Sequence, residues 1–190
     1  MAEKKFKKVL IANRGEICMR VQHALREMGI TACAVYSDAD RVARHTLFAD
    51  EAYPIGPGPS NESYLVIEKI IAAAKEAGAD AIHPGYGFLS ENAAFVQIVE
   101  DHGITFIGPT AEHIRLMGDK ITAKETMLAL GVPCVPGSEG GVATLEDAIR
   151  VGAEIGFPLI VKATAGGGGR GMKLAKTAED LETAFQTARS

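Results

Sequence analysis

Short runs of β-branched and other apolar residues alternate with longer amphipathic stretches over the first part of the chain. The runs predict strands at residues 8–12, 31–36, 52–55, 81–83 and 105–107. Between the first two runs, apolar residues recur with helical spacing over residues 17–28, and Gly29 follows where a helix would end. Strands that alternate with helices in this way build a parallel sheet covered by helices. The pattern therefore predicts an α/β domain.

The alternation stops after Gly108 and Pro109. Two helical segments then follow without an intervening strand, and the second has Asp119 as its predicted N-cap. The later elements are predicted as a helix at residues 145–155, strands at 159–163 and 172–175, and a helix at 178–189. The sequence therefore predicts a first domain at residues 1–117, a helical linker at 118–134 and a smaller α+β unit at 135–190.

The composition is that of a globular protein, with 47% hydrophobic and 23% charged residues and a net charge of −4. A slightly acidic chain has no general attraction for nucleic acid. Apolar runs such as residues 70–74 are too short to cross a bilayer. The three cysteines are odd in number and lie outside any CxxC pattern, which argues against a disulfide framework or a zinc site. We therefore expect a cytoplasmic protein without a nucleic-acid or membrane partner.

A glycine-rich segment joins the last two predicted strands. It reads KATAGGGGRGMK over residues 162–173, and four consecutive glycines let the backbone approach an anion and turn several N–H groups toward it. Three of its glycines formally match the dinucleotide fingerprint, but that motif must open a helix, whereas here a strand pattern follows. A P-loop also fails, because Met172 stands at the lysine position. The segment is typical of a flap over a polyphosphate, and the alternative is a flexible surface hairpin.

Two lysines are candidates for binding that polyphosphate. Lys162 lies in a predicted strand among Ile160 and Val161, where burial of an unpaired ammonium group would be costly, so an anion is expected to meet it. The alternative is that its ammonium group reaches solvent at a sheet edge. Lys120 follows the predicted N-cap Asp119, where a cation opposes the helix dipole. That placement favours a functional role, although surface lysines also occur at helix starts.

The segment HPGYGFLSEN at residues 83–92 begins at the carboxyl end of a predicted parallel strand, where open α/β sheets bind ligands. Gly85 and Gly87 let the backbone come near a ligand, and Tyr86 offers a flat face and a hydroxyl group. The alternative is a structural turn with Tyr86 and Phe88 packed in the core. At the end of the first strand, Arg14 is expected to fix the turn, with Glu16 as its candidate partner, rather than to bind an anion.

Six segments in this order are similar to those of biotin carboxylases. They are residues 11–17, 83–92, 106–109, 117–120, 131–137 and 162–172. Six motifs in one order are far more specific than any one of them, and together they span nearly the whole chain. The resemblance implies a Rossmann-like pre-ATP-grasp domain with a parallel sheet, followed by the first part of an ATP-grasp domain.

The resemblance also implies an activity. In that family ATP and bicarbonate form carboxyphosphate, whose breakdown supplies CO2 for transfer to biotin on a carrier protein. Carried over by motif, Lys120 and Lys162 would hold ATP phosphates, and Gly168 and Gly169 would lie in the loop that closes over them. Tyr86 and Gly87 would lie beside the pocket for biotin or bicarbonate. ATP and Mg²⁺ are the implied cofactors, with biotin as a carrier-bound substrate.

The family continues well beyond Ser190 into a second lobe that carries the Mg²⁺ ligands, the general base and the arginines for bicarbonate and biotin. The resemblance therefore implies no catalytic residue and no metal ligand in this chain, and we expect the chain alone to be catalytically silent. The implied partners are a biotin carboxyl carrier protein, carboxyltransferase subunits and a second copy of the full-length chain.

Three alternatives remain open. The expected reaction is the first half-reaction of acetyl-CoA carboxylase in fatty acid synthesis, but carboxylases that act on pyruvate or propionyl-CoA share the same module. A non-catalytic nucleotide-binding or assembly module is a different class of function. An NAD-dependent oxidoreductase rests on the formal glycine match alone.

Overall fold

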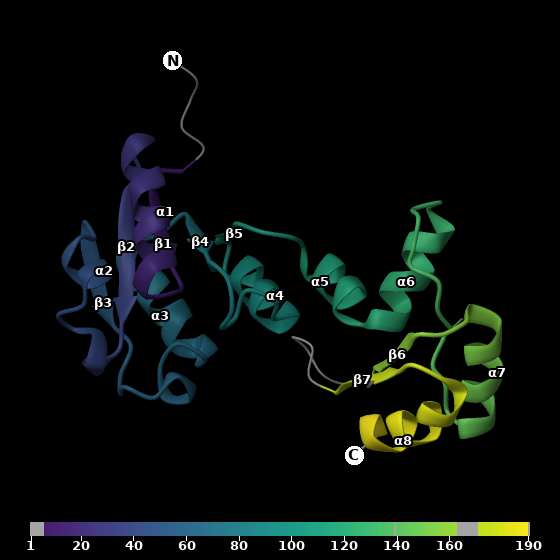
Figure 1. Ribbon diagram of the computed structural model, residues 1–190. Coiled ribbons are helices and arrows are strands. Elements are labelled where there is room, and N and C mark those ends of the chain that lie inside the picture. The colour runs from purple at the N-terminus through teal and green to yellow at the C-terminus, as the bar shows by residue number, and fades with distance from the viewer. Residues whose placement is uncertain (1–5, 139, 163–170, 190) are drawn as a thin grey trace. The chain divides into compact units, whose positions relative to one another are not determined.

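The computed structural model describes residues 6–138, 140–162 and 171–189 of a chain that divides into two compact units (Figure 1). The first unit is Met1–Arg115 and the second is Leu116–Ser190. Residues 118–134 thus belong to the second unit, and the three-part scheme with a separate linker stays a prediction. No helix among the described residues is long and apolar enough to span a membrane.

The first unit is built on a five-stranded parallel sheet with the strand order β3-β2-β1-β4-β5. The strands are β1 (Lys8–Ile11), β2 (Thr31–Tyr36), β3 (Glu51–Pro54), β4 (Ala81–His83) and β5 (Thr105–Phe106). The predicted parallel α/β fold is confirmed. Because β2 and β3 lie on one side of β1, and β4 and β5 on the other, the topological switch point of the sheet lies between β1 and β4.

Helices cover both faces of this sheet. They are α1 (Gly15–Glu27), the short α2 (Arg44–Leu47), α3 (Ile67–Ala77) and α4 (Ala93–Asp101), with 3-10 turns at Asp38–Asp40 and Ser60–Glu62. Helix α5 (Ala111–Gly118) follows β5 and crosses the boundary between the two units. Successive side chains of a strand point to opposite faces, so Val9 and Ile11 join the apolar cluster under α1, while Leu10 joins the cluster under α3 and α4. Burial on both faces explains why the strands read as continuous apolar runs.

The second unit is a β-hairpin with helices packed on one face. Its elements are α6 (Lys120–Ala129), α7 (Leu145–Ile155), β6 (Leu159–Lys162), β7 (Met172–Ala175) and α8 (Ala178–Arg189). The two strands are antiparallel, and Leu181 and Phe185 of α8 belong to the apolar cluster beneath them. The side chain of Asp119 accepts a hydrogen bond from the backbone N–H of Thr122 (2.8 Å), which confirms the predicted N-cap of α6.

Candidate functional site

The second unit contains a large cavity between α6, the segment that follows it, and the hairpin. The cavity has a volume of about 1210 Å³, and both Lys120 and Lys162 line it. These two lysines lie 42 positions apart in the sequence (162 − 120), on a helix start and at a strand end respectively. The structure therefore brings the two predicted phosphate-binding lysines to one cavity. The predicted loop residues Gly168 and Gly169 lie outside the described residues.

The hairpin shows where that glycine-rich segment begins and ends. Lys162 is the last residue of β6 and pairs with Met172, the first residue of β7. The segment thus joins two strand ends that lie side by side, and it does not open a helix. This arrangement contradicts the dinucleotide fingerprint, on which the oxidoreductase alternative depended.

One premise about Lys162 is wrong. The apolar neighbours in its strand were expected to bury it, but Lys162 is exposed and Ile160 keeps 53% of its surface exposed. On the same face of the hairpin, Met172 and Leu174 are 46% and 56% exposed. The face therefore presents an apolar surface with a cation at its end, which suits a ligand with one flat apolar part and one anionic part.

The cavity also contains a lysine that the sequence analysis missed. Lys124 lines it one helical turn after Lys120, and its Nζ donates a hydrogen bond to the backbone oxygen of Ser138 (3.0 Å). A side chain on Gly137 would place its Cβ 3.0 Å from that Nζ, so the glycine leaves room for the contact. The spacing of Lys120 and Lys124 on one helix face was the signal that could have revealed it.

The first unit contains the second predicted site, at the switch point of its sheet. Asn13, directly after β1, is 3% exposed, and its Nδ2 donates hydrogen bonds to the backbone oxygens of Pro84 (2.7 Å) and Tyr86 (2.8 Å) in the segment after β4. Its Oδ1 accepts a hydrogen bond from the N–H of Arg14 (2.9 Å). The carboxyl ends of β1 and β4 are thus tied together where α/β sheets bind ligands.

His83 and Gly85 shape the start of that segment. The Nδ1 atom of His83 accepts a hydrogen bond from the backbone N–H of Gly85 (3.0 Å), and burial lowers the pKa of His83. The ring is therefore neutral at pH 7, with its proton on Nε2. Gly85 has a φ of +65°, and a Cβ there would lie 2.8 Å from Nδ2 of Asn13, so the close approach requires glycine.

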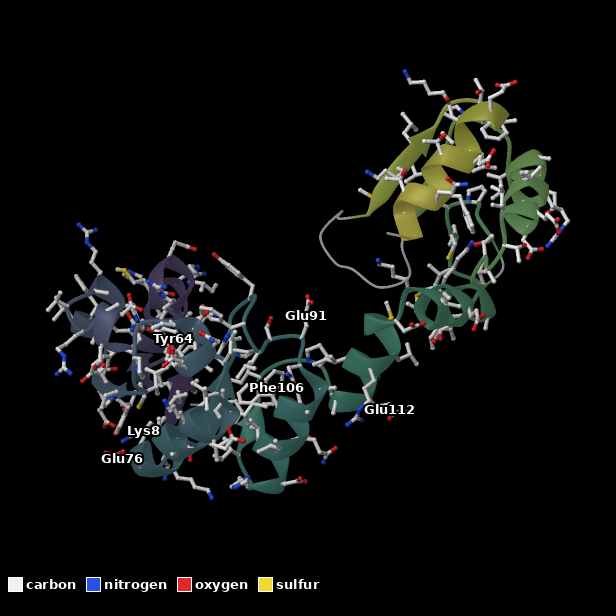
Figure 2. The ribbon with its side chains drawn as sticks, turned by 90° about the horizontal axis from the view of Figure 1, so that it is seen from below. Lys8, Tyr64, Glu76, Glu91, Phe106 and Glu112 are labelled. Carbon is white, nitrogen blue, oxygen red and sulfur yellow. The ribbon has the colours of Figure 1, made fainter. Side chains whose placement is uncertain are left out.

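Tyr86 and Phe88 differ in their surroundings. Tyr86 is 64% exposed, and its hydroxyl donates a long hydrogen bond to Glu16 (3.3 Å). Phe88 is half-buried and stacks on Tyr64, with ring centroids 5.2 Å apart and planes at 4°. Tyr64 lies inside the first unit (Figure 2). The interpretation of this segment as a structural turn thus holds for Phe88, whereas Tyr86 is exposed and its place beside a ligand pocket stays a prediction.

Arg14 has the structural role that was predicted, although its partner is a different residue. Its guanidinium pairs with Asp40 (2.8 Å) rather than with Glu16. Asp40 is 6% exposed, and it also accepts hydrogen bonds from the hydroxyls of Tyr64 (2.7 Å) and Ser37 (3.2 Å). Nothing in the sequence pattern indicates this network, because Arg14, Asp40 and Tyr64 lie in separate segments of the chain.

Among the described residues, no group of three or more His, Cys, Asp or Glu side chains lies close enough to hold a metal ion. The thiols of Cys18 and Cys33 are buried, and burial raises the pKa of each to about 12, so both stay protonated.

A parallel α/β unit, followed by a lobe with a lysine-lined cavity and an antiparallel hairpin, is the arrangement expected of ATP-grasp proteins. Residues 5–114 match the family described as "Biotin carboxylase, N-terminal domain", and residues 119–190 match "Carbamoyl-phosphate synthase L chain, ATP binding domain". The chain belongs to the biotin carboxylase family.

Relatives support both halves of that match. The chain is 58% identical over 184 residues to the biotin carboxylase of Nostoc sp. and 57% identical over 183 residues to the chloroplastic biotin carboxylase of Arabidopsis thaliana. These alignments cover 97% and 96% of this chain but 41% and 34% of the relatives. The chain thus spans less than half the length of the curated relatives it matches.

Solved structures of biotin carboxylases support the same family assignment. A biotin carboxylase from Campylobacter jejuni, described as a beta-gamma-ATP complex, is 52% identical and superposes with a TM-score of 0.91, covering 97% of this chain and 41% of that one. The biotin carboxylase domain dimer of Hydrogenobacter thermophilus 2-oxoglutarate carboxylase, described with MgADP, ADP and bicarbonate, is 50% identical with a TM-score of 0.86, covering 98% and 42%.

Proposed function

We propose that this chain forms the N-terminal part of a biotin carboxylase, in which ATP and bicarbonate yield carboxyphosphate and the released CO2 is transferred to biotin on a carrier protein. The observation that carries the proposal is that Lys120 and Lys162 line one cavity. Lys162 also stands at the strand end where the glycine-rich segment begins. Cations and glycine amides are suited to the charge that develops on a transferring phosphoryl group.

Each site has a distinct role in this proposal. The two lysines hold the ATP phosphates, the segment with Gly168 and Gly169 closes over them, and the exposed apolar face of the hairpin contacts the nucleoside. Tyr86 and Gly87 border the pocket for bicarbonate or biotin. Mg²⁺ would neutralise phosphate charge when bound, and its ligands would come from the part of the protein that corresponds to the remaining length of the relatives.

The partners and the acceptor belong to the same proposal. We propose a cytoplasmic enzyme that works as a homodimer with a biotin carboxyl carrier protein and carboxyltransferase subunits, in the acetyl-CoA carboxylase reaction of fatty acid synthesis. Relatives named for 2-oxoglutarate and pyruvate carboxylases, at 51% identity each, use the same module, so the acceptor is decided by the partner subunits rather than by the residues described above.

The test uses a protein of the relatives' full length that carries these 190 residues. We expect ATP hydrolysis that depends on bicarbonate, and fixation of labelled bicarbonate on biotin. Replacement of Lys162 by alanine should lower kcat/KM for ATP by about a hundredfold, because a charge-assisted contact to phosphate is lost. The 190-residue chain alone should bind ATP more weakly after the same substitution and should not hydrolyse it.

Lys173 offers a matched control, because it lies in β7 of the same hairpin and its side chain belongs to the opposite face from Lys162. Lys173→Ala should leave kcat/KM for ATP unchanged. ATP binding that is equally insensitive to both substitutions would favour the non-catalytic module. Hydrolysis without any dependence on bicarbonate would refute the proposed reaction.

A further inference from the structure

The segment after β4 is held at its start by one side chain from the end of β1. Asn13 uses its amide group to bind two carbonyl oxygens, those of Pro84 and Tyr86, at 2.7 and 2.8 Å. Asn13 is almost fully buried, so water cannot replace these bonds if they are lost. The path of residues 84–86 therefore depends on this amide.

The same segment is held at its end by a second chain of contacts. Phe88 has a φ of +43°, a conformation that is unfavourable for a residue with a large side chain. Its ring stacks on Tyr64, whose hydroxyl donates to Asp40, and Asp40 pairs with Arg14. Both ends of the segment thus lead back to two consecutive residues, Asn13 and Arg14.

Tyr86 lies between these two anchors. Its side chain is exposed and its hydroxyl contact with Glu16 is long, at 3.3 Å, so the position of the ring depends on the position of its backbone. Asn13 fixes that backbone directly, through the carbonyl oxygen of Tyr86 itself. A substitution at Asn13 should therefore displace Tyr86 and Gly87, although the two residues that are proposed to border the ligand pocket are themselves unchanged.

We infer that Asn13 is a positioning residue, which holds Tyr86 and Gly87 in the geometry that binds bicarbonate or biotin. The inference rests on the proposed function for the identity of the ligands. The clamp itself, which ties the end of β1 to the segment after β4, does not depend on that function. The two parts are tested by separate measurements.

The clamp is tested on the 190-residue chain with Asn13→Asp. Aspartate has the same shape, but it turns an oxygen toward two carbonyl oxygens and cannot donate. We expect the backbone amides of Gly85 and Ser90, which donate to Nδ1 of His83 (3.0 Å) and to the carbonyl oxygen of Gly87 (2.9 Å), to exchange with solvent about tenfold faster, while the amides of β2 keep their protection. Unchanged exchange at both residues would overturn the inference.

Gln22 provides the matched control. Its buried side chain also donates to a backbone oxygen, that of His45 (2.7 Å), but this residue lies in α2. Gln22→Glu should leave the exchange of Gly85 and Ser90 unchanged. An equal acceleration in both variants would show general loosening and would contradict a specific clamp. If Asn13→Asp does not fold, Phe88→Leu removes the stacking contact at the other end and should accelerate the same amides; no acceleration would again overturn the inference.

The role in ligand binding is tested in the full-length enzyme. Asn13→Asp should raise KM for bicarbonate and for biotin by about tenfold, because both hydrogen bonds that fix the backbone of this segment are lost, and should leave KM for ATP unchanged. An equal change in all three constants would show a merely structural role and refute positioning. A parent enzyme without bicarbonate-dependent hydrolysis would refute the proposed function, while amide exchange would still decide whether the clamp exists.

Discussion

At the scale of single residues, Asp40 shows how a buried charge is satisfied in this fold. It pairs with Arg14 and accepts hydrogen bonds from Tyr64 and Ser37, so each of these donors offsets part of the cost of removing the carboxylate from water. The hydroxyl of Tyr64 is buried between Asp40 and the backbone N–H of Ser37, and its pKa is raised, first by burial and then by the hydrogen bond to Asp40.

Loss of this hydroxyl should therefore destabilise the first unit. Tyr64→Phe keeps the ring and its stack on Phe88 but leaves Asp40 with one donor fewer, at a cost of about 1–3 kcal/mol in the free energy of unfolding. The measurement is urea denaturation. Tyr53→Phe is the control, because its hydroxyl donates to Glu51 (2.6 Å), which keeps a bond to Lys8 and access to water. A loss in the control as large as that for Tyr64 would contradict the argument.

His83 gives a prediction for the pH dependence of stability. Burial lowers its pKa in the folded state below the ordinary value of 6.5, so the unfolded chain binds the proton first as the pH falls. The contribution of neutral His83 to stability is thus fully present above pH 6.5 and is lost progressively below it. In His83→Asn the amide oxygen can accept from Gly85 without titrating, so denaturation midpoints should fall less between pH 7.5 and 5.5 than in the parent. An equal fall in both proteins would contradict this.

At the scale of elements, Gly152 sets how closely α7 approaches its neighbours. A Cβ at this position would lie 3.2–3.3 Å from side-chain atoms of Leu181, Leu159 and Phe157. Gly152→Leu should therefore overpack the cluster and lower the free energy of unfolding by about 1–3 kcal/mol. Ala153→Leu adds a large side chain to the exposed side of the same helix and should change stability by less than about 0.5 kcal/mol. Equal effects would show that the site is not crowded.

The elements themselves were largely predictable from sequence. Strand β2 and helix α7 have the predicted bounds, because each is a periodic apolar segment between clear start and stop signals. The short α2 was not predicted, because four residues are too few to show a helical period. Strand β6 is described over Leu159–Lys162, and the predicted last residue, 163, lies outside the described residues.

Sequence reasoning about the candidate site worked from local chemistry. Lys120 and Lys162 were predicted to bind phosphate because each stands out against its own neighbours, and both line one cavity in the structure. Asn13 was missed, since its partners lie 71 and 73 positions away and an asparagine after a strand is unremarkable by itself. The strand order explains the contact: once β4 lies beside β1, the residues after the two strands meet at one edge of the sheet.

At the scale of the whole molecule, each unit has its own hydrophobic core. Among the described residues, the two clusters of the first unit contain no residue beyond Ile114, and the cluster of the second unit begins at Val142. Units with separate cores can unfold separately. We therefore expect two transitions in calorimetry of the 190-residue chain.

Core variants identify the transitions. Leu10 is completely buried in β1 and Leu181 is 1% exposed in α8, so replacing either by alanine removes comparable apolar volume from one core only. Each variant should lose about 2–5 kcal/mol from its own unit. Leu10→Ala should lower the midpoint of one transition and Leu181→Ala that of the other. A single transition that both variants lower equally would show that the cores unfold as one cooperative body, and the division into two units would then have no energetic meaning.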